Sequence, residues 1–455
     1  MKLHTPCRPG AILTLASLLA AAFAFAADEP APPPSDDARA LARRILADPR
    51  PAKVRAMGLD LLRSGLNAGS GYAEVWIRDL NTFIVPALEV TPRDTIRHAL
   101  LVFFHFQGPD GDIVDGYVPA DRAHVGYKYR TSPTQPDLRA HKNTVETDQE
   151  SSLVLAVARY LRTTGDRSLL AEEVRGRTVR QRLEDALDYL FAHRFSPQHG
   201  LIWGATTADW GDVQPEHSWG VELDEHSHRA IDIYDNALLV TAIDALVETV
   251  LTEEPATAAR WRQRRAELAR RIRRHLWDER RQQFIPHLYL DEGSPWPAGF
   301  DESRIFYHGG TAVAIEAGLL TPEEILTVYG QMRANCRLSG AATIGLTLYP
   351  AYPDGFFLNP AMKPYSYQNG GDWTWFGARM VRQLAERGFP AIAWRELQPM
   401  LDRVLQHGGF YEWWTVDNQP RGSGKFRGSA GVLIEAIDAL QAWARTRLAS
   451  GNEAR

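Results

Sequence analysis

Cysteine is nearly absent from this chain of 455 residues, which contains only Cys7 and Cys336. Cys7 precedes an apolar N-terminal run that has the pattern of a cleaved signal peptide, so Cys336 would remain alone. A single cysteine excludes an internal disulfide, and the core must hold the fold without crosslinks. No thiol-activating pair lies beside Cys336 in the sequence, which argues against a cysteine nucleophile.

The chain also lacks a hydrophobic run long enough to be a membrane span. Residues 11–26 are apolar, follow the basic residues Lys2 and Arg8, and end in Ala24-Phe25-Ala26. This pattern predicts a secretory signal peptide over residues 1–26. We therefore expect an exported protein, periplasmic or secreted, that has no membrane attachment after signal cleavage.

An excess of positive charge is missing as well. The formal net charge is -5, and signal cleavage would remove two further positive charges. No basic face for nucleic acid is evident, so we expect no nucleic-acid partner. The composition, with 44% hydrophobic and 24% charged residues, is that of a globular protein with ample material for a core.

Helical periodicity dominates the chain after a Pro-rich leader at residues 27–36, which we predict to be disordered. The pattern predicts about a dozen paired helices within one domain over residues 37–450. Capping boxes are expected at Thr147–Glu150 and Thr321–Glu324, and residues 228–252 form one long apolar helix in this prediction. Strand patterns are local, at residues 284–290 and 410–426.

Four long loops concentrate Trp, Tyr, Asp, Glu and Gly, at residues 108–142, 200–227, 344–371 and 408–428. Long loops in a compact domain usually carry function. Paired helices with rich loops at alternate joints predict an all-α (α/α)6 toroid, with small local β-hairpins in its loops. In that arrangement the rich loops gather on one face.

Two aspartates flank an indole in Asp209-Trp210-Gly211-Asp212. An indole face stacks on a sugar ring and raises the pKa of a neighbouring acid by excluding water. Asp is also a common turn residue, so the motif alone leaves a structural role open. A second acid among aromatic residues is Glu412, which precedes Trp413, and a buried glutamate there would be costly unless paired or held for chemistry.

Three more motifs contain candidate sugar contacts. An Arg-Asp pair can grip two vicinal hydroxyls or form a buried salt bridge, and an acid at a helix start can bind a ligand or complement the helix dipole. A double glycine lets backbone approach a ligand closely. The candidates in these motifs are Trp76, Arg78, Asp79, Asp148, Tyr367, Asn369 and Trp373.

Histidines and acids alternate over residues 216–228, which invites a metal interpretation. Their spacing matches no compact zinc pattern such as His-Glu-x-x-His. A solvated acidic loop is the favoured interpretation, and a structural calcium ion is left open. We expect no catalytic metal and no cofactor.

Several of these motifs together resemble the six-hairpin glycosidase superfamily. Residues 76–79 resemble the Trp-x-Arg-Asp sugar clamp of glucoamylases and neutral invertases, and residues 367–373 resemble the Tyr-x-Asn-Gly-Gly-x-Trp stretch of neutral invertases and debranching-enzyme glucosidase domains. Residues 411–413 resemble the segment with their second catalytic acid, and residues 209–212 the acid-bearing stretch of cellobiose- and chitobiose-type phosphorylases. The Asp-Arg-Arg stretch of neutral invertases is missing, which argues against sucrose.

The resemblance implies an inverting glycoside hydrolase that acts on an oligosaccharide or glycoside, with an α-glucoside expected. It implies Asp212 as general acid, with Asp209 as the rival, and Glu412 as general base. Arg78 and Asp79 would hold the sugar, and the supporting contacts would come from Trp76, Asp148, Trp210, Tyr367, Asn369, Trp373 and Trp413. The alternatives are a non-catalytic sugar-binding protein on the same toroid, or a polysaccharide lyase with His217 or Tyr367 as base.

Overall fold

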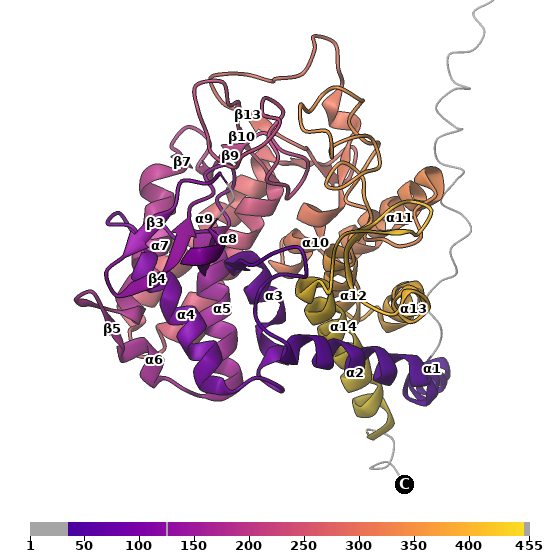
Figure 1. The fold of residues 1–455 in the computed structure, drawn as a ribbon. Helices are drawn as coiled ribbons and strands as arrows, with labels where there is room; N and C mark the ends of the chain where they lie inside the picture. The colour runs from indigo at the N-terminus through magenta and orange to yellow at the C-terminus, as the bar shows by residue number, and fades with distance from the viewer. Residues whose placement is uncertain (1–34, 124–125, 450–455) are drawn as a thin grey trace, which may run out of the picture.

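The computed structural model describes residues 35–123 and 126–449 (Figure 1). The predicted signal peptide and residues 27–34 of the predicted leader lie outside the described residues. The first helix, α1 (Ser35–Ala47), begins inside the stretch that the sequence assigned to the leader.

Six helices form a closed inner ring in which each helix packs against the next. The last helix of the ring returns to the first, because α14 contacts α3 as well as α12. These helices are buried over most of their surfaces, and α8 and α10 are apolar on nearly every face. In ring order they are α3 (Ile77–Ala87), α5 (Gln149–Thr164), α8 (Ile233–Ala245), α10 (His308–Glu316), α12 (Thr374–Glu386) and α14 (Arg427–Ala449).

A second set of six helices packs outside this ring, and each of them contacts at least one inner helix that is its neighbour in the chain. The outer helices bury one stripe and expose the rest, as surface helices do. They are α2 (Pro49–Arg63), α4 (Arg93–Phe106), α7 (Val179–His193), α9 (Pro255–His275), α11 (Pro322–Ser339) and α13 (Pro390–His407). The predicted (α/α)6 toroid is confirmed.

Short antiparallel strands lie close to the N-terminal ends of several inner helices. β1 (Val75–Trp76) pairs with β2 (Gly116–Pro119), and β16 (Tyr411–Trp414) pairs with β17 (Pro420–Gly424). The predicted local strands at 410–426 are confirmed, whereas the stretch 284–290 is divided between the end of β12 and β13, which pair in different sheets. The other short elements are β3 (Arg130–Ser132), β4 (Gln135–His141), α6 (Ser168–Ala171), β5 (Glu173–Val174), β6 (Arg177–Thr178), β7 (Phe195–Ser196), β8 (Leu201–Ile202), β9 (Gly204–Ala205), β10 (Arg229–Ile231), β11 (Trp277–Asp278), β12 (Gln283–Phe284), β13 (Leu288–Tyr289), β14 (Phe306–Tyr307) and β15 (Leu348–Tyr349).

The predicted long helix over residues 228–252 begins later than the apolar pattern suggested. Residues 229–231 form β10, which pairs with both β9 and β13. Asp232 then caps α8 by accepting a hydrogen bond from the Asp235 N–H at 2.9 Å. Strand pairing therefore outweighs helical propensity at this end, and the other end widens into a π-helical turn at Leu246–Val250.

One of the two predicted capping boxes is correct. Thr321 and Glu324 form the reciprocal bonds at the start of α11. The prediction for Thr147–Glu150 was wrong, because the Thr147 hydroxyl donates to Asp235 and the Glu150 carboxylate accepts from the Ile113 N–H and Lys142. Tertiary partners occupy the groups that a local cap would have used.

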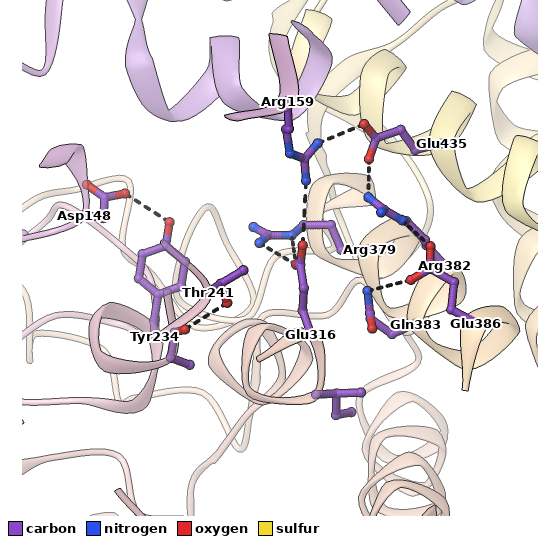
Figure 2. A network of polar contacts seen from close by, with 12 residues as sticks. Asp148, Arg159, Tyr234, Thr241, Glu316, Arg379, Arg382, Gln383, Glu386 and Glu435 are labelled. Carbon is purple, nitrogen blue, oxygen red and sulfur yellow. Dashed lines mark hydrogen bonds and ion pairs between the residues drawn. The ribbon is translucent and has the colours of Figure 1, made fainter. Parts of the chain in front are cut away.

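A network of ion pairs, most of them half-buried, connects helices of the ring (Figure 2). Arg159 of α5 pairs with Glu435 of α14 at 2.8 Å, and Arg379 of α12 pairs with Glu316 of α10 at 2.9 Å. Arg382 of α12 also pairs with Glu435, at 2.5 Å. Because α5 and α12 stand opposite each other in the ring, these pairs tie together helices from both sides of its axis.

Candidate active site

A cavity opens at the N-terminal ends of the inner helices. Arg78 and Asp79 lie in the first turn of α3, Trp373 precedes α12, and Phe426 precedes α14. The positive ends of several helix dipoles therefore face a cavity that is rich in carboxylates. Its lining consists of Tyr72, Trp76, Arg78, Asp79, Asp115, Tyr127, Trp210, Asp212, Val213, Trp219, Gly220, Val221, Asn359, Tyr367, Gln368, Trp373, Trp375, Glu412 and Phe426.

Glu412 projects into this cavity from β16 and is buried. The Tyr72 hydroxyl donates to Glu412 Oε1 at 2.8 Å, and the Ser423 N–H donates to Oε2 at 2.7 Å. Burial raises the pKa of Glu412, the two donors oppose that rise, and the charge of Asp212 adds to it. The result is a carboxylate fixed through both oxygens, in an environment that makes it more basic than a free glutamate.

Asp212 lies in the same cavity and is half-buried. Its Oδ1 accepts a hydrogen bond from Gln368 Nε2 at 2.7 Å. Gln368 belongs to the motif at residues 367–373, so two motifs that are far apart in sequence meet at this carboxyl group. The structure thus brings Asp212 and Glu412, the two acids singled out in the sequence, to one site.

Arg78 forms ion pairs with two buried carboxylates that lie outside the cavity lining. It forms ion pairs with Glu146 and with Asp148, the latter at 2.7 Å between Nε and Oδ2. Asp148 also accepts a hydrogen bond from the Tyr234 hydroxyl at 3.0 Å (Figure 2). Asp148 is completely buried and does not line the cavity, so the prediction of a direct sugar contact is corrected: it positions Arg78.

Asp79 is the neighbouring half of the predicted sugar clamp. Burial raises the pKa of Asp79 to about 8, although the charge of Arg78 lowers it, and Glu412 raises it further. Among the described residues, Asp79 Oδ1 has no hydrogen-bond partner. Because Asp79 lines the cavity, this carboxyl oxygen without a protein partner is available to hydrogen-bond with a ligand hydroxyl.

Asp209 is placed differently from its sequence neighbour Asp212. Its two carboxylate oxygens accept hydrogen bonds from the N–H groups of Gly309 and Gly310, at 2.6 Å and 2.8 Å, in the first turn of α10. Burial raises the pKa of Asp209 to about 8 against these two donors. It does not line the cavity, so its prediction as rival general acid is corrected: Asp209 holds the start of α10.

Aromatic rings form much of the cavity wall. Trp210 packs edge-to-face against Trp373 and Trp375, with ring centroids 4.6 Å and 5.2 Å apart. Trp76 packs against Tyr72 at 4.4 Å on the side of Glu412. The predicted contacts Trp76, Trp210, Tyr367 and Trp373 all line the cavity.

Two other predicted contacts lie outside the lining. Asn369 is buried and holds the surrounding loop, accepting from the Tyr352 N–H at 2.8 Å and donating to the Tyr352 and Met362 carbonyls. Trp413 packs against Tyr367 beside the cavity. The prediction of direct contact is corrected for Asn369, because its amide holds the loop that carries Tyr367. Trp413 is half-buried beside the cavity, and its sugar contact stays a prediction.

Sequence reasoning missed several lining residues, which are Tyr72, Tyr127, Gln368, Trp219 and Phe426. Asp115 and Trp375 also line the cavity and were not among the predicted contacts. Gln368 lies inside the motif at residues 367–373, whereas Tyr72, Tyr127 and Trp219 follow no spacing pattern, and only the closure of the ring brings them to the cavity. The loop histidines pair locally instead, His217 with Asp224 at 2.8 Å and His228 with Glu216 at 2.5 Å.

Among the described residues, no group of three or more His, Cys, Asp or Glu side chains is arranged to hold a metal ion. Within the same part of the chain, no helix is both long and apolar enough to cross a membrane.

No protein-family model matches the chain, and no curated protein sequence matches it significantly. Solved structures do. A GH63 mannosylglycerate hydrolase from Thermus thermophilus in complex with Tris aligns with a TM-score of 0.61 and 18% identity, over 84% of this chain and 99% of that one. The chain shares its fold.

A further solved neighbour is a rhamnosidase from Klebsiella oxytoca with rhamnose bound, which aligns with a TM-score of 0.56 and 16% identity over 86% of this chain. A GH78 rhamnosidase of a Bacillus species aligns with a TM-score of 0.57 and 14% identity over 85%. The chain covers 63% and 34% of those two proteins, so each is longer than the shared toroid.

Proposed function

We propose that this chain is an exported glycoside hydrolase that cleaves an oligosaccharide or glycoside with inversion at the anomeric carbon. The observation that carries the proposal is the pair Asp212 and Glu412 in one aromatic-walled cavity, beside the Arg78–Asp79 pair. The toroid that it shares with a mannosylglycerate hydrolase and with rhamnosidases supports a sugar substrate. Export is proposed from the N-terminal pattern of residues 1–26.

In this mechanism Asp212 protonates the glycosidic oxygen as the bond to the anomeric carbon breaks. Gln368 holds Asp212 Oδ1 and leaves the other carboxyl oxygen to carry the proton. Glu412 removes a proton from the water that attacks the opposite face of the sugar. The arrangement requires the two carboxyl groups to stand about 6.5–9.5 Å apart, with room for that water between them.

The remaining groups bind and orient the sugar. Asp79 accepts a hydroxyl hydrogen bond through its free oxygen, and Arg78 donates beside it from a position fixed by Asp148. The indoles exclude water and stack on the apolar face of the ring. We propose an α-glucoside as substrate because residues 76–79 resemble the clamp of glucoamylases.

The test is a panel of aryl glycosides and disaccharides, including α-glucosides, α-mannosides and α-rhamnosides. On a substrate that is hydrolysed, Glu412→Gln and Asp212→Asn should each lower kcat by about 10²–10⁴-fold, because each removes a proton-transfer group. Substrate binding by calorimetry should persist, and proton NMR of the first product should show the inverted anomer.

Asp417→Asn, in the exposed turn between β16 and β17, is the matched control and should retain activity. Full activity of Glu412→Gln would remove that residue from the mechanism. Saturable sugar binding without turnover by the unchanged protein would identify a sugar-binding protein instead.

A further inference from the structure

An exposed indole stands at the mouth of the cavity. Trp219 is 54% exposed, yet it lines the same cavity as Asp212 and Glu412. Of the large hydrophobic side chains that are exposed in the described residues, Trp219 is the aromatic one. An indole left open to water beside a buried polar cavity is a surface on which a ligand can stack.

Trp219 is the outer member of a stack of rings. Its ring lies 5.3 Å from that of Tyr127 with an interplanar angle of 22°, and Tyr127 lies 4.1 Å from the ring of His141 at 10°. His141 is buried, so the stack runs from the interior to the surface and fixes the orientation of the outer ring. Trp219 therefore presents a face that is already ordered before a ligand arrives, which reduces the entropic cost of binding.

The stack stands on the leaving-group side of the site. Trp219 and Asp212 belong to the same long loop, at residues 200–227. The charge of Asp212 reaches both Tyr127 and Tyr72, whereas Glu412 accepts its hydrogen bond from Tyr72 and is not among the charges that act on Tyr127. The acid of an inverting hydrolase must contact the glycosidic oxygen, so the leaving group lies next to Asp212 rather than next to Glu412.

The charges of the cavity limit what that leaving group can be. Four carboxyl groups line it, from Asp79, Asp115, Asp212 and Glu412. Among the described lining residues Arg78 is the one cation, and its charge is met by Glu146 and Asp148. Asp79, with a pKa of about 8, and Asp212, which carries the proton that it donates, are neutral in the reactive state, but Asp115 and the base Glu412 are ionised. A carboxylate on the leaving group would therefore meet like charge without an unpaired cation to receive it.

We propose that Trp219 and Tyr127 form the leaving-group subsite, and that this subsite takes a neutral group with a flat apolar face, a second sugar ring or an aryl ring, and rejects carboxylate-bearing leaving groups. The inference rests on the proposed hydrolase function. It adds a specificity that the catalytic acids alone do not set.

The experiment compares leaving groups on one sugar, the sugar being the one that the panel identifies. Steady-state kinetics are measured for the methyl, phenyl and 4-carboxyphenyl glycosides and for a disaccharide. The unchanged protein should hydrolyse the phenyl glycoside at least about tenfold more efficiently than the 4-carboxyphenyl glycoside at pH 7, and the difference should shrink as added salt screens the charges.

Trp219→Ala should lower kcat/KM for the phenyl glycoside and the disaccharide about tenfold more than for the methyl glycoside, since a methyl group has no ring to stack. Trp219→Phe should restore most of this loss. Leu338→Ala, another exposed apolar side chain outside the cavity lining, is the control and should change none of these ratios. Thermal melting confirms that each variant is folded.

The outcomes separate the two proposals. If no glycoside in the panel is hydrolysed, both fail. If glycosides are hydrolysed but Trp219→Ala lowers kcat/KM by the same factor for every leaving group, the subsite assignment is wrong and the hydrolase proposal stands. Equal efficiency toward phenyl and 4-carboxyphenyl glycosides would overturn the charge selectivity.

Discussion

At the scale of single residues, the site depends on how each carboxyl group is held. Glu412 accepts hydrogen bonds from the Tyr72 hydroxyl and the Ser423 N–H. Asp212 accepts one from the side-chain amide of Gln368, and one oxygen of Asp79 has no hydrogen-bond partner among the described residues. Three carboxyl groups in one cavity thus differ in their hydrogen-bond donors. That difference, rather than their residue type, underlies the separate roles that we propose for them as base, acid and sugar ligand.

The bond from Tyr72 to Glu412 leads to a prediction about pH dependence. The hydroxyl stabilises the ionised carboxylate, so it lowers the pKa of Glu412 against the rise that burial causes. A general base acts only when ionised, and its activity is lost as the pH falls through its pKa. Tyr72→Phe should therefore move the acidic limb of the kcat/KM profile to higher pH, by up to about one pH unit.

The measurement is the pH–rate profile on the substrate found in the panel. Tyr189→Phe, on α7 and remote from the cavity, is the control and should leave both limbs in place. An unshifted acidic limb in Tyr72→Phe would mean that Glu412 does not set that limb.

At the scale of elements, Asp209 shows how a motif residue serves a helix. Its carboxylate receives two N–H groups at the start of α10, and its backbone is in the left-handed region with φ of 57°. Asp209→Ala would leave both buried donors without an acceptor. We expect a loss of about 3 kcal/mol in the free energy of unfolding, from about 1–3 kcal/mol for each donor.

Urea unfolding measures this loss, with Asp354→Ala in an exposed loop as the control. Asp209→Asn retains one acceptor oxygen and tolerates the left-handed backbone, so its unfolding free energy should lie between those of Asp209→Ala and the control. An Asp209→Ala protein that is as stable as the unchanged protein but inactive would instead indicate a catalytic role for Asp209.

At the scale of the whole molecule, the half-buried ion pairs between ring helices couple elements that are remote in sequence. Burial by itself would raise the pKa of Glu316, but the charges of Arg379, Arg159 and Arg382 outweigh it and lower that pKa to about 2. A carboxyl whose folded pKa lies below its unfolded value stabilises the protein above the unfolded value. This stabilisation is lost as the pH falls through the folded pKa.

Glu316→Gln should therefore cost roughly 3 kcal/mol of unfolding free energy at pH 7, from a shift of about two and a half pKa units. Between about pH 4.5 and pH 2 the variant should lose less stability than the unchanged protein. Chemical unfolding at a series of pH values measures both effects.

Glu386→Gln, at the exposed end of the same network, is the matched control and should cost at most about 1 kcal/mol. If the two variants were equally stable, the ring interior would not depend on the charge of Glu316.

The toroid was predictable because its signal is repeated. Helical periodicity and the alternation of short and rich joints recur along the chain, so one wrong boundary, such as the start of α8, leaves the architecture intact. The site was predictable only in part. Arg78, Asp79, Asp212 and Glu412 stand in local motifs that the cavity brings together, whereas Tyr72, Tyr127 and Trp219 carry no local pattern.

The sequence by itself determined the helices, their pairing and the identity of the acids, since those follow from periodicity and residue chemistry along a single stretch. Only the tertiary structure decided which acids face the cavity. Asp209 and Asp212 are three residues apart and chemically alike. Asp209 accepts hydrogen bonds from the N-terminus of α10, whereas Asp212 accepts one from Gln368 in the cavity. The partner that each carboxyl finds across the closed ring fixes its role, and that partner lies about a hundred residues or more away in the chain.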